Sequence, residues 1–118
     1  MTKSFDRVMR EQSAKLIKIV DEIVKAASGN SDDGSAEAAY ESLSLAAQEA
    51  KAVIEASKAT SVQEGRKKTA IGIMMDLAVA GKAGAIGSKN LDEGGRLITL
   101  SIATIRGAIP LLEEWKGG

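Results

Sequence analysis

The sequence contains neither cysteine nor histidine. Without cysteine the chain has no thiolate nucleophile, no disulfide and no cysteine metal site. Without histidine it lacks the commonest general base and the commonest transition-metal ligand. A serine–histidine–aspartate hydrolase and a helical di-iron site of the usual Glu-x-x-His kind are therefore excluded. Aspartate, glutamate, lysine and tyrosine form no recognisable catalytic group, so we expect no enzyme, no metal and no cofactor.

Aromatic residues and proline are also scarce. The sequence has one phenylalanine, one tyrosine, one tryptophan and one proline: Phe5, Tyr40, Trp115 and Pro110. Strand patterns of aromatic and β-branched residues are rare, whereas alanine is abundant, which favours helix over sheet. A chain of 118 residues can bury a core without disulfides. Composition thus predicts one all-α domain.

The chain carries no excess charge, with 16 basic and 16 acidic residues. A nucleic-acid partner is disfavoured because such binders usually carry a basic face. The first residues alternate charged and apolar side chains and do not resemble a conventional secretory peptide. We expect a cytoplasmic protein, with export by a route without a signal peptide left open.

Apolar residues recur at steps of three and four through most of the chain. This periodicity predicts four helices, over about residues 4–27, 36–59, 62–86 and 90–115. Short connections between long helices favour antiparallel neighbours. We therefore predict a single-domain antiparallel four-helix bundle. Pro110 removes a backbone donor and clashes with the preceding turn, which predicts a kink in the last helix.

Three helix starts carry capping signals. Ser35 is expected to be the N-cap of the second helix. Ser61 with Glu64, and Asn90 with Glu93, have the spacing of capping boxes, in which each side chain accepts a hydrogen bond from the other residue's backbone N–H.

The last helix has the strongest apolar pattern. Its predicted core stripe consists of Leu91, Ile98, Ile105 and Leu112 at heptad spacing, flanked by Ile102 and Ile109. The alternative is a strand over 97–105, where apolar and small polar residues alternate. No other stretch offers it a pairing strand, so we expect helix.

Small residues indicate close packing on the second helix and, separately, on the third. The core face of the second helix is mostly alanine, which allows close approach of another helix. Gly81, Gly84 and Gly87 lie near the end of the third helix, where each glycine costs about 1 kcal/mol relative to alanine. We expect close backbone packing at these glycines, or else an earlier end to the helix.

Three consecutive basic residues at the start of the third helix form the basic cluster: Arg66, Lys67 and Lys68. One interpretation is a site for an anion or an acidic partner, since cations are unfavourable at a helix N-terminus. The other is a solvated face whose positive charge is balanced by Glu64 and Glu55. Tyr40 is expected to cap the core with its hydroxyl in water, with stacking on a ligand as the alternative.

Asp76 lies in the most apolar part of the third helix. If it is buried it needs a cationic partner, and Arg106, which is likewise flanked by apolar residues, is the candidate. The alternative places each residue on the wet side of its own helix. Two apolar runs, 70–86 and 97–112, also suggest a membrane hairpin, but the charges of Asp76 and Lys82 disfavour insertion of the first.

The leading functional hypothesis is a non-enzymatic helical module that binds a protein partner, with a homo-oligomer as one form. It follows from the lack of catalytic residue types and from more apolar helix faces than one slim bundle needs. The first alternative is a small-ligand or anion-binding module that uses the basic cluster and Tyr40. The second is a membrane-active or lipid-contacting hairpin of the last two helices.

Overall fold

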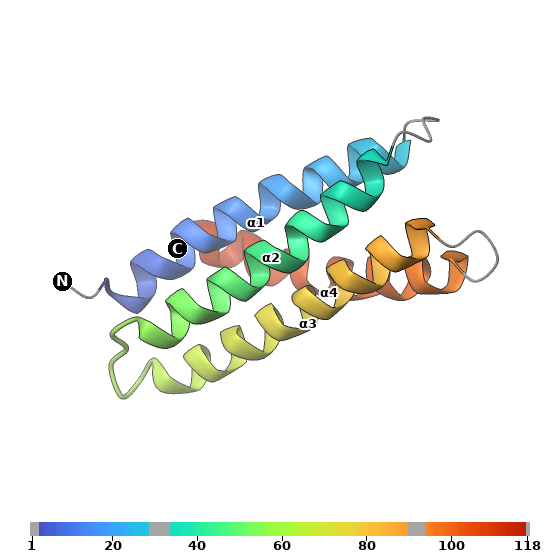
Figure 1. Cartoon of the computed structure of the whole chain (residues 1–118). Coiled ribbons are helices and arrows are strands. Elements are labelled where there is room, and N and C mark those ends of the chain that lie inside the picture. Colours follow the sequence, from blue (N-terminus) through green and yellow to red (C-terminus); the bar gives the residue numbers. More distant parts are fainter. Residues whose placement is uncertain (1–2, 29–33, 90–93, 118) are drawn as a thin grey trace.

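The computed structural model describes residues 3–28, 34–89 and 94–117, which form four α-helices (Figure 1). The helices are α1 (Phe5–Ser28), α2 (Ser35–Ala56), α3 (Glu64–Lys89) and α4 (Gly94–Gly117). The all-α class and the four-helix bundle are thereby confirmed. Residues 97–105 lie inside α4, so the strand alternative is wrong.

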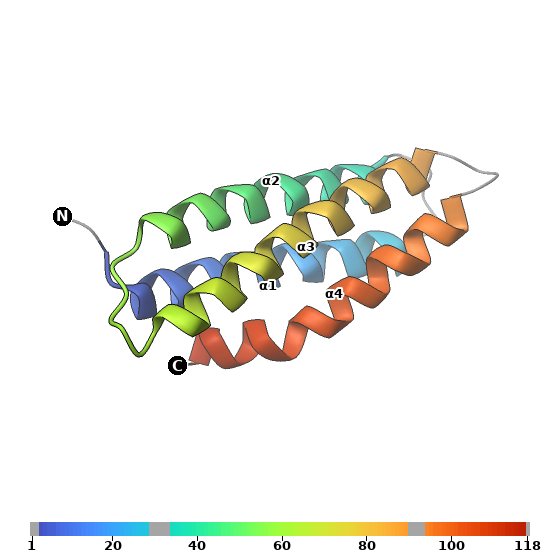
Figure 2. The ribbon, with the colours of Figure 1, turned by 90° about the horizontal axis from the view of Figure 1, so that it is seen from below.

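The four helices lie along one long axis, with overall dimensions of 48 × 23 × 20 Å. Figures 1 and 2 show that successive helices run in opposite directions and that the start of α1 and the end of α4 lie at the same end of the bundle. Each helix packs on two others, because α1 contacts α2 and α4, and α3 also contacts α2 and α4. The helices therefore form a ring around one core.

Each helix contributes one fully buried leucine to the core. The four are Leu16, Leu43, Leu77 and Leu112. Around them α2 and α3 bury mainly small side chains, whereas α1 buries larger aliphatic ones. Full burial of a leucine contributes about 1.5–3 kcal/mol, so the core draws on all four helices.

Helix α2 ends at Ala56, three residues before the predicted end. Ser57 is extended, and its hydroxyl donates a hydrogen bond to the Ile54 carbonyl (2.5 Å). The backbone N–H of Lys58 donates to the Lys3 carbonyl, and the N–H of Phe5 donates to the Lys58 carbonyl, both at 3.0 Å. These bonds fasten the chain after α2 to the start of α1.

Two of the three predicted caps, those at Ser35 and Ser61, are not the observed ones. Gly34, at φ 83°, occupies the N-cap position of α2 and makes no side-chain cap, so Ser35 is the first helical residue instead. Ahead of α3 the capping pair lies one residue earlier than predicted. The Gln63 N–H donates to the Thr60 hydroxyl (3.3 Å), and the Thr60 N–H donates to the Gln63 side-chain oxygen (3.0 Å).

Tertiary contact accounts for the shift to Gln63. Its side-chain amide also donates a hydrogen bond to the Asp6 carboxylate of α1 at 3.0 Å. The predicted capping pair of Ser61 and Glu64 could not make this bond, because a glutamate carboxylate has no hydrogen to donate. The Asn90 and Glu93 pair lies outside the described residues.

The buried side of α4 matches the predicted stripe in part, because Ile105 and Leu112 are buried as predicted. The buried residues are Gly94, Ser101, Ile105, Ala108 and Leu112. By contrast, Ile98, Ile102 and Ile109 are half-buried, and Leu91 lies outside the described residues. The Ser101 hydroxyl donates to the Ala80 carbonyl of α3 (2.7 Å), which turns the small-residue side of α4 inward. Pro110 lies within α4, and the kink there stays a prediction.

Candidate functional site

The closest helix contact joins α2 and α3. A Cβ added to Gly81 would lie 2.6 Å from the backbone nitrogen of Ser44 and from the Tyr40 carbonyl oxygen. A Cβ at Gly84 would overlap the ring of Tyr40. Such distances are far below ordinary van der Waals contact. The expected close packing at these glycines is confirmed, and α3 continues to Lys89 rather than ending early.

Tyr40 is part of this contact. Its side chain is buried on the face of Gly84, and burial raises the pKa of its phenol above the ordinary value of 10.0. A side chain that is only 2% exposed cannot stack on a ligand, so that alternative is wrong, whereas the contact of the hydroxyl with water stays a prediction. Tyr40 therefore cannot meet a ligand beside the basic cluster.

Two of the three residues in the basic cluster make contacts within the chain. The Arg66 guanidinium lies 3.9 Å from the Asp6 carboxylate and 6.0 Å from the centre of the Phe5 ring. The Lys67 ammonium donates to the Ser57 carbonyl just after α2, at 3.0 Å. Lys68 is exposed. These contacts join the start of α3 to α1 and to the end of α2, and they leave less of the cluster for an external anion.

Asp76 and Arg106 do not form a buried ion pair. Both residues are exposed, so the interpretation in which each lies on the wet side of its helix is correct. Asp76 instead lines a groove between α3 and α4. Its charge is hydrated there and needs no partner inside the core.

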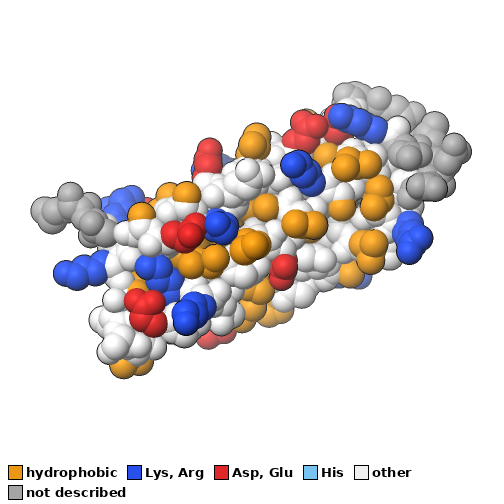
Figure 3. Space-filling model, turned by 60° about the horizontal axis from the view of Figure 1, so that its bottom comes forward, with side chains coloured by type: hydrophobic (Ala, Val, Ile, Leu, Met, Phe, Trp, Pro, Cys, Tyr) orange, Lys and Arg blue, Asp and Glu red, His pale blue; other side chains and the backbone are white. Residues whose placement is uncertain are grey.

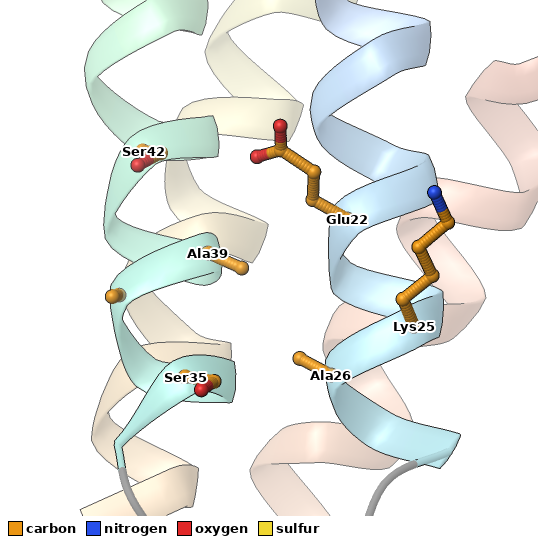
Figure 4. Close-up of a pocket in the computed structure, with 7 residues that line it drawn as sticks. Glu22, Lys25, Ala26, Ser35, Ala39 and Ser42 are labelled. Carbon is orange, nitrogen blue, oxygen red and sulfur yellow. The ribbon is translucent and has the colours of Figure 1, made fainter.

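A shallow depression lies between α1 and α2, with a volume of about 480 Å³. Figure 4 shows Ala26 and Ala39 facing each other across it and the Glu22 carboxylate reaching toward Ser42. Lys25 extends to the other side of α1 in the same view. A single carboxylate beside small residues offers no converging set of groups, so this depression is a weak candidate for catalysis or tight binding.

Two further grooves flank α3. The groove toward α4 has a volume of about 430 Å³ and includes Val79, Leu100 and Thr104. The groove toward α2 has a volume of about 510 Å³ and includes Leu45, Lys82 and Ile86. Both walls of each groove are helices, and both grooves open to solvent on the outer side of α3.

Between the grooves runs a line of exposed apolar side chains, which we name the outer ridge: Met75, Val79 and Ile86. Their exposed fractions are 52%, 69% and 54%. Leu100 on α4 and Leu45 on α2 extend the apolar surface to either side, with exposed fractions of 56% and 62%. Figure 3 shows this face, where hydrophobic side chains gather along the middle and charged groups are scattered among them.

The outer ridge was only partly visible in the sequence. Adjoining apolar stripes on the third helix indicated a surplus of apolar faces, but periodicity did not say which stripe remains outside. The available signal was the spacing of Met75, Val79 and Ile86, four and seven residues apart, opposite the buried Leu77.

The two helices that carry most of this surface, α3 and α4, are long and apolar enough to cross a membrane. The most apolar part of α3 is 44% buried in the bundle, whereas that of α4 is only 22% buried. A helix in the core of a soluble bundle can be equally long and apolar because its apolar residues are buried. Since α4 is less buried than α3, its apolar composition is the more unusual.

No group of three or more acidic side chains suited to a metal ion occurs among residues 3–28, 34–89 and 94–117. In comparisons with known proteins, no family model, no curated protein and no solved structure matches the chain.

Proposed function

We propose that this chain is a non-enzymatic helical interaction module that binds a protein partner through the outer ridge of α3 and the adjoining surface of α4. The observation that carries the proposal is the ridge itself, three large apolar side chains more than half exposed on one side of one helix. Contiguous apolar surface of this kind marks interaction sites in soluble proteins.

The shape of this surface supports a helical partner. A ridge between two grooves is the form that one helix presents to another when side chains interdigitate. Covering apolar surface is favourable by about 25 cal/mol per Å², and the charges of Asp76 and Lys82 at the margin give the contact orientation.

Contact with a membrane is the second candidate, and the low burial of α4 is the observation that favours it. Against it, Asp76 and Lys82 are exposed on the outer side of α3, and Arg96 and Arg106 are exposed on α4. Each such charge opposes insertion by about 2.5–3.5 kcal/mol at the centre of a bilayer. Binding of an anion at the basic cluster has less support, because Arg66 and Lys67 have partners within the chain.

Site-specific photo-crosslinking tests the proposal. A photo-reactive amino acid at Val79 is compared with one at Val62, which is 88% exposed but lies in the turn before α3. In cells that produce the chain we expect protein adducts from position 79 and few from position 62. Equal adducts from both positions, or none from position 79, would contradict the proposal, and adducts with lipid alone would support the membrane alternative.

A further inference from the structure

We infer that the partner of the outer ridge is a second copy of this chain, whose α3 packs antiparallel against the first with a two-fold axis beside Val79. The inference rests on the proposed function, because it names the partner of the same surface. A two-fold contact uses one patch on both copies, so that patch must be complementary to itself.

The outward residues of α3 have this property. Three pairs lie at equal distances before and after Val79, at three, four and seven positions: Asp76 with Lys82, Met75 with Ala83, and Gly72 with Ile86. The first pair combines an acidic and a basic residue, and each of the other two pairs combines a large apolar residue with a small one. All of them are exposed or half-buried in the bundle.

Helix geometry shows which residues of the two copies this symmetry brings close together. At 1.5 Å per residue, Asp76 and Lys82 lie about 4.5 Å before and after Val79 along the axis, and all six paired residues point within about 60° of Val79. Reversal of a second α3 about Val79 brings its Lys82 level with Asp76 along the axis, with the two residues on opposite sides of the Val79 direction, so the long lysine side chain reaches across the interface to the carboxylate. The same reversal brings its Ile86 level with Gly72.

Gly72 provides a separate argument. A glycine inside a helix costs about 1 kcal/mol relative to alanine. Gly81 and Gly84 are explained by their contact with α2, whereas a Cβ at Gly72 would meet nothing within 4 Å. Packing within the bundle does not require this glycine. In the proposed pair it makes room for Ile86 of the second copy.

The charges also select the direction of packing. In a parallel pair each residue lies level with itself, so Asp76 would face Asp76 and Lys82 would face Lys82. Like charges at an interface are unfavourable by several kcal/mol. The antiparallel pair replaces both repulsions with two opposite-charge pairs.

Sedimentation equilibrium over micromolar concentrations tests the association. We expect a dimer of the 12.3 kDa chain. Val79→Asp places two carboxylates at the axis and is expected to weaken association by at least about a hundredfold, whereas Val62→Asp leaves it unchanged. Circular dichroism checks that both variants keep their helices. A strictly monomeric wild-type chain, or equal dimerisation of the Val79→Asp variant, would overturn the inference.

A charge exchange tests the direction. Asp76→Lys alone replaces both opposite-charge pairs with like charges and is expected to weaken the dimer by at least about a hundredfold. Adding Lys82→Asp restores the opposite-charge pairs in the antiparallel arrangement and is expected to restore the dissociation constant. A double variant as weak as the single variant would contradict the antiparallel pairing.

The register is tested with cysteines, which the natural chain lacks. A Gly72→Cys variant and an Ile86→Cys variant, mixed and treated with a short bis-maleimide, are expected to form mainly the mixed adduct. Adducts of each variant with itself would contradict the antiparallel register. A Val62→Cys variant serves as the control and is expected to remain uncrosslinked.

These outcomes separate the two proposals. If the wild-type chain is monomeric but position 79 crosslinks to another protein, the second copy is wrong and the interaction module stands. If position 79 crosslinks to no protein and the chain is monomeric, both are wrong. A dimer disrupted by Val79→Asp, together with self-adducts from position 79, supports both.

Discussion

Two glycines of α3 that face α2 and a third on its outer side have different surroundings. Gly81 and Gly84 face α2, where the backbone and the Tyr40 ring leave no room for a Cβ. Gly72 faces away from these contacts, and a Cβ there would meet open space. The first two are required by the fold. The third has no such requirement within the chain, and the proposed second copy supplies one.

The same contrast applies to the large apolar residues of α3. Met74 and Leu77 are fully buried, whereas their neighbours Met75 and Val79 are more than half exposed. Folding of one chain accounts for the first pair only. Substitutions on the inner and outer sides of the helices should therefore differ in their effect on stability. The free energies of unfolding are to be compared at one protein concentration, because self-association would otherwise change them.

The largest effect is expected from Tyr40→Ala. This substitution removes a buried ring from the contact with Gly84 and leaves a cavity, so the free energy of unfolding should fall by about 3–5 kcal/mol. Urea unfolding followed by circular dichroism measures it. Leu45→Ala, at an exposed position of the same helix, is the control and should change stability by less than about 0.5 kcal/mol. Equal losses in both variants would remove the distinction between the two sides.

A smaller loss is expected from Gly81→Ala. The added methyl group would meet the backbone of α2, which cannot move aside as a side chain can. Overpacking of this kind lowers the free energy of unfolding by about 1–3 kcal/mol, and a gain in helix propensity offsets part of it. Thermal and urea unfolding measure the change. A stabilised variant would show that α2 and α3 do not approach as closely as described.

The matched substitution on the outer side has the opposite sign. Gly72→Ala adds a methyl group in open space and restricts the unfolded chain, so it should raise the free energy of unfolding of the dilute chain by about 0.5–1 kcal/mol. The same substitution should weaken self-association, because Ile86 of the second copy then meets a methyl group. Destabilisation of the dilute monomer would mean that Gly72 has an internal role.

The smallest effect concerns the surface ion pair at the end of α3. The Lys89 ammonium donates to the Glu37 carboxylate of α2 at 2.9 Å, and this bond and the charge of Glu37 raise the pKa of Lys89 above 10.5. A raised lysine pKa stabilises the fold below pH 10.5 and the contribution disappears as the pH rises through the folded-state pKa. Glu37→Gln should therefore lower the Lys89 pKa.

An NMR titration of the Lys89 side chain measures this shift. Glu41→Gln is the matched control, because the Glu41 carboxylate lies farther from the same ammonium, at 3.9 Å, and its removal should shift the pKa less. Equal shifts in the two variants would show that Lys89 is not held at Glu37.

Close helix packing on α2 and on α3 could be predicted from the sequence, but not that these two helices contact each other. Alanines on one face of α2 and glycines near the end of α3 are local features with a single physical use, which is close approach of two helices. The contact partners were not predictable. The contact between Gly84 and Tyr40 depends on how far each helix is rotated about its own axis. Local sequence patterns do not determine this rotation.

One other local signal was misread, and two left alternatives open, because tertiary contacts compete with local patterns. Thr60 rather than Ser61 completes the capping pair, since Gln63 also contacts Asp6 of α1. Asp76 lies in an apolar stretch of sequence, yet its position on the wet side of α3 depends on where α4 packs. In the sequence Arg66 suggested a site for an external anion, whereas in the structure its guanidinium lies beside Asp6 and Phe5 of α1.

The sequence by itself determined that this protein is a bundle of four helices, because apolar spacing and helix propensity act over a few residues. It also determined the absence of histidine and cysteine chemistry. Only the tertiary structure decided which apolar stripes are covered and which remain outside. Periodicity identifies the residues that share a face of a helix, whereas coverage of that face depends on neighbours distant in the sequence. The outer ridge of α3 is visible only once α2 and α4 have taken their places beside it.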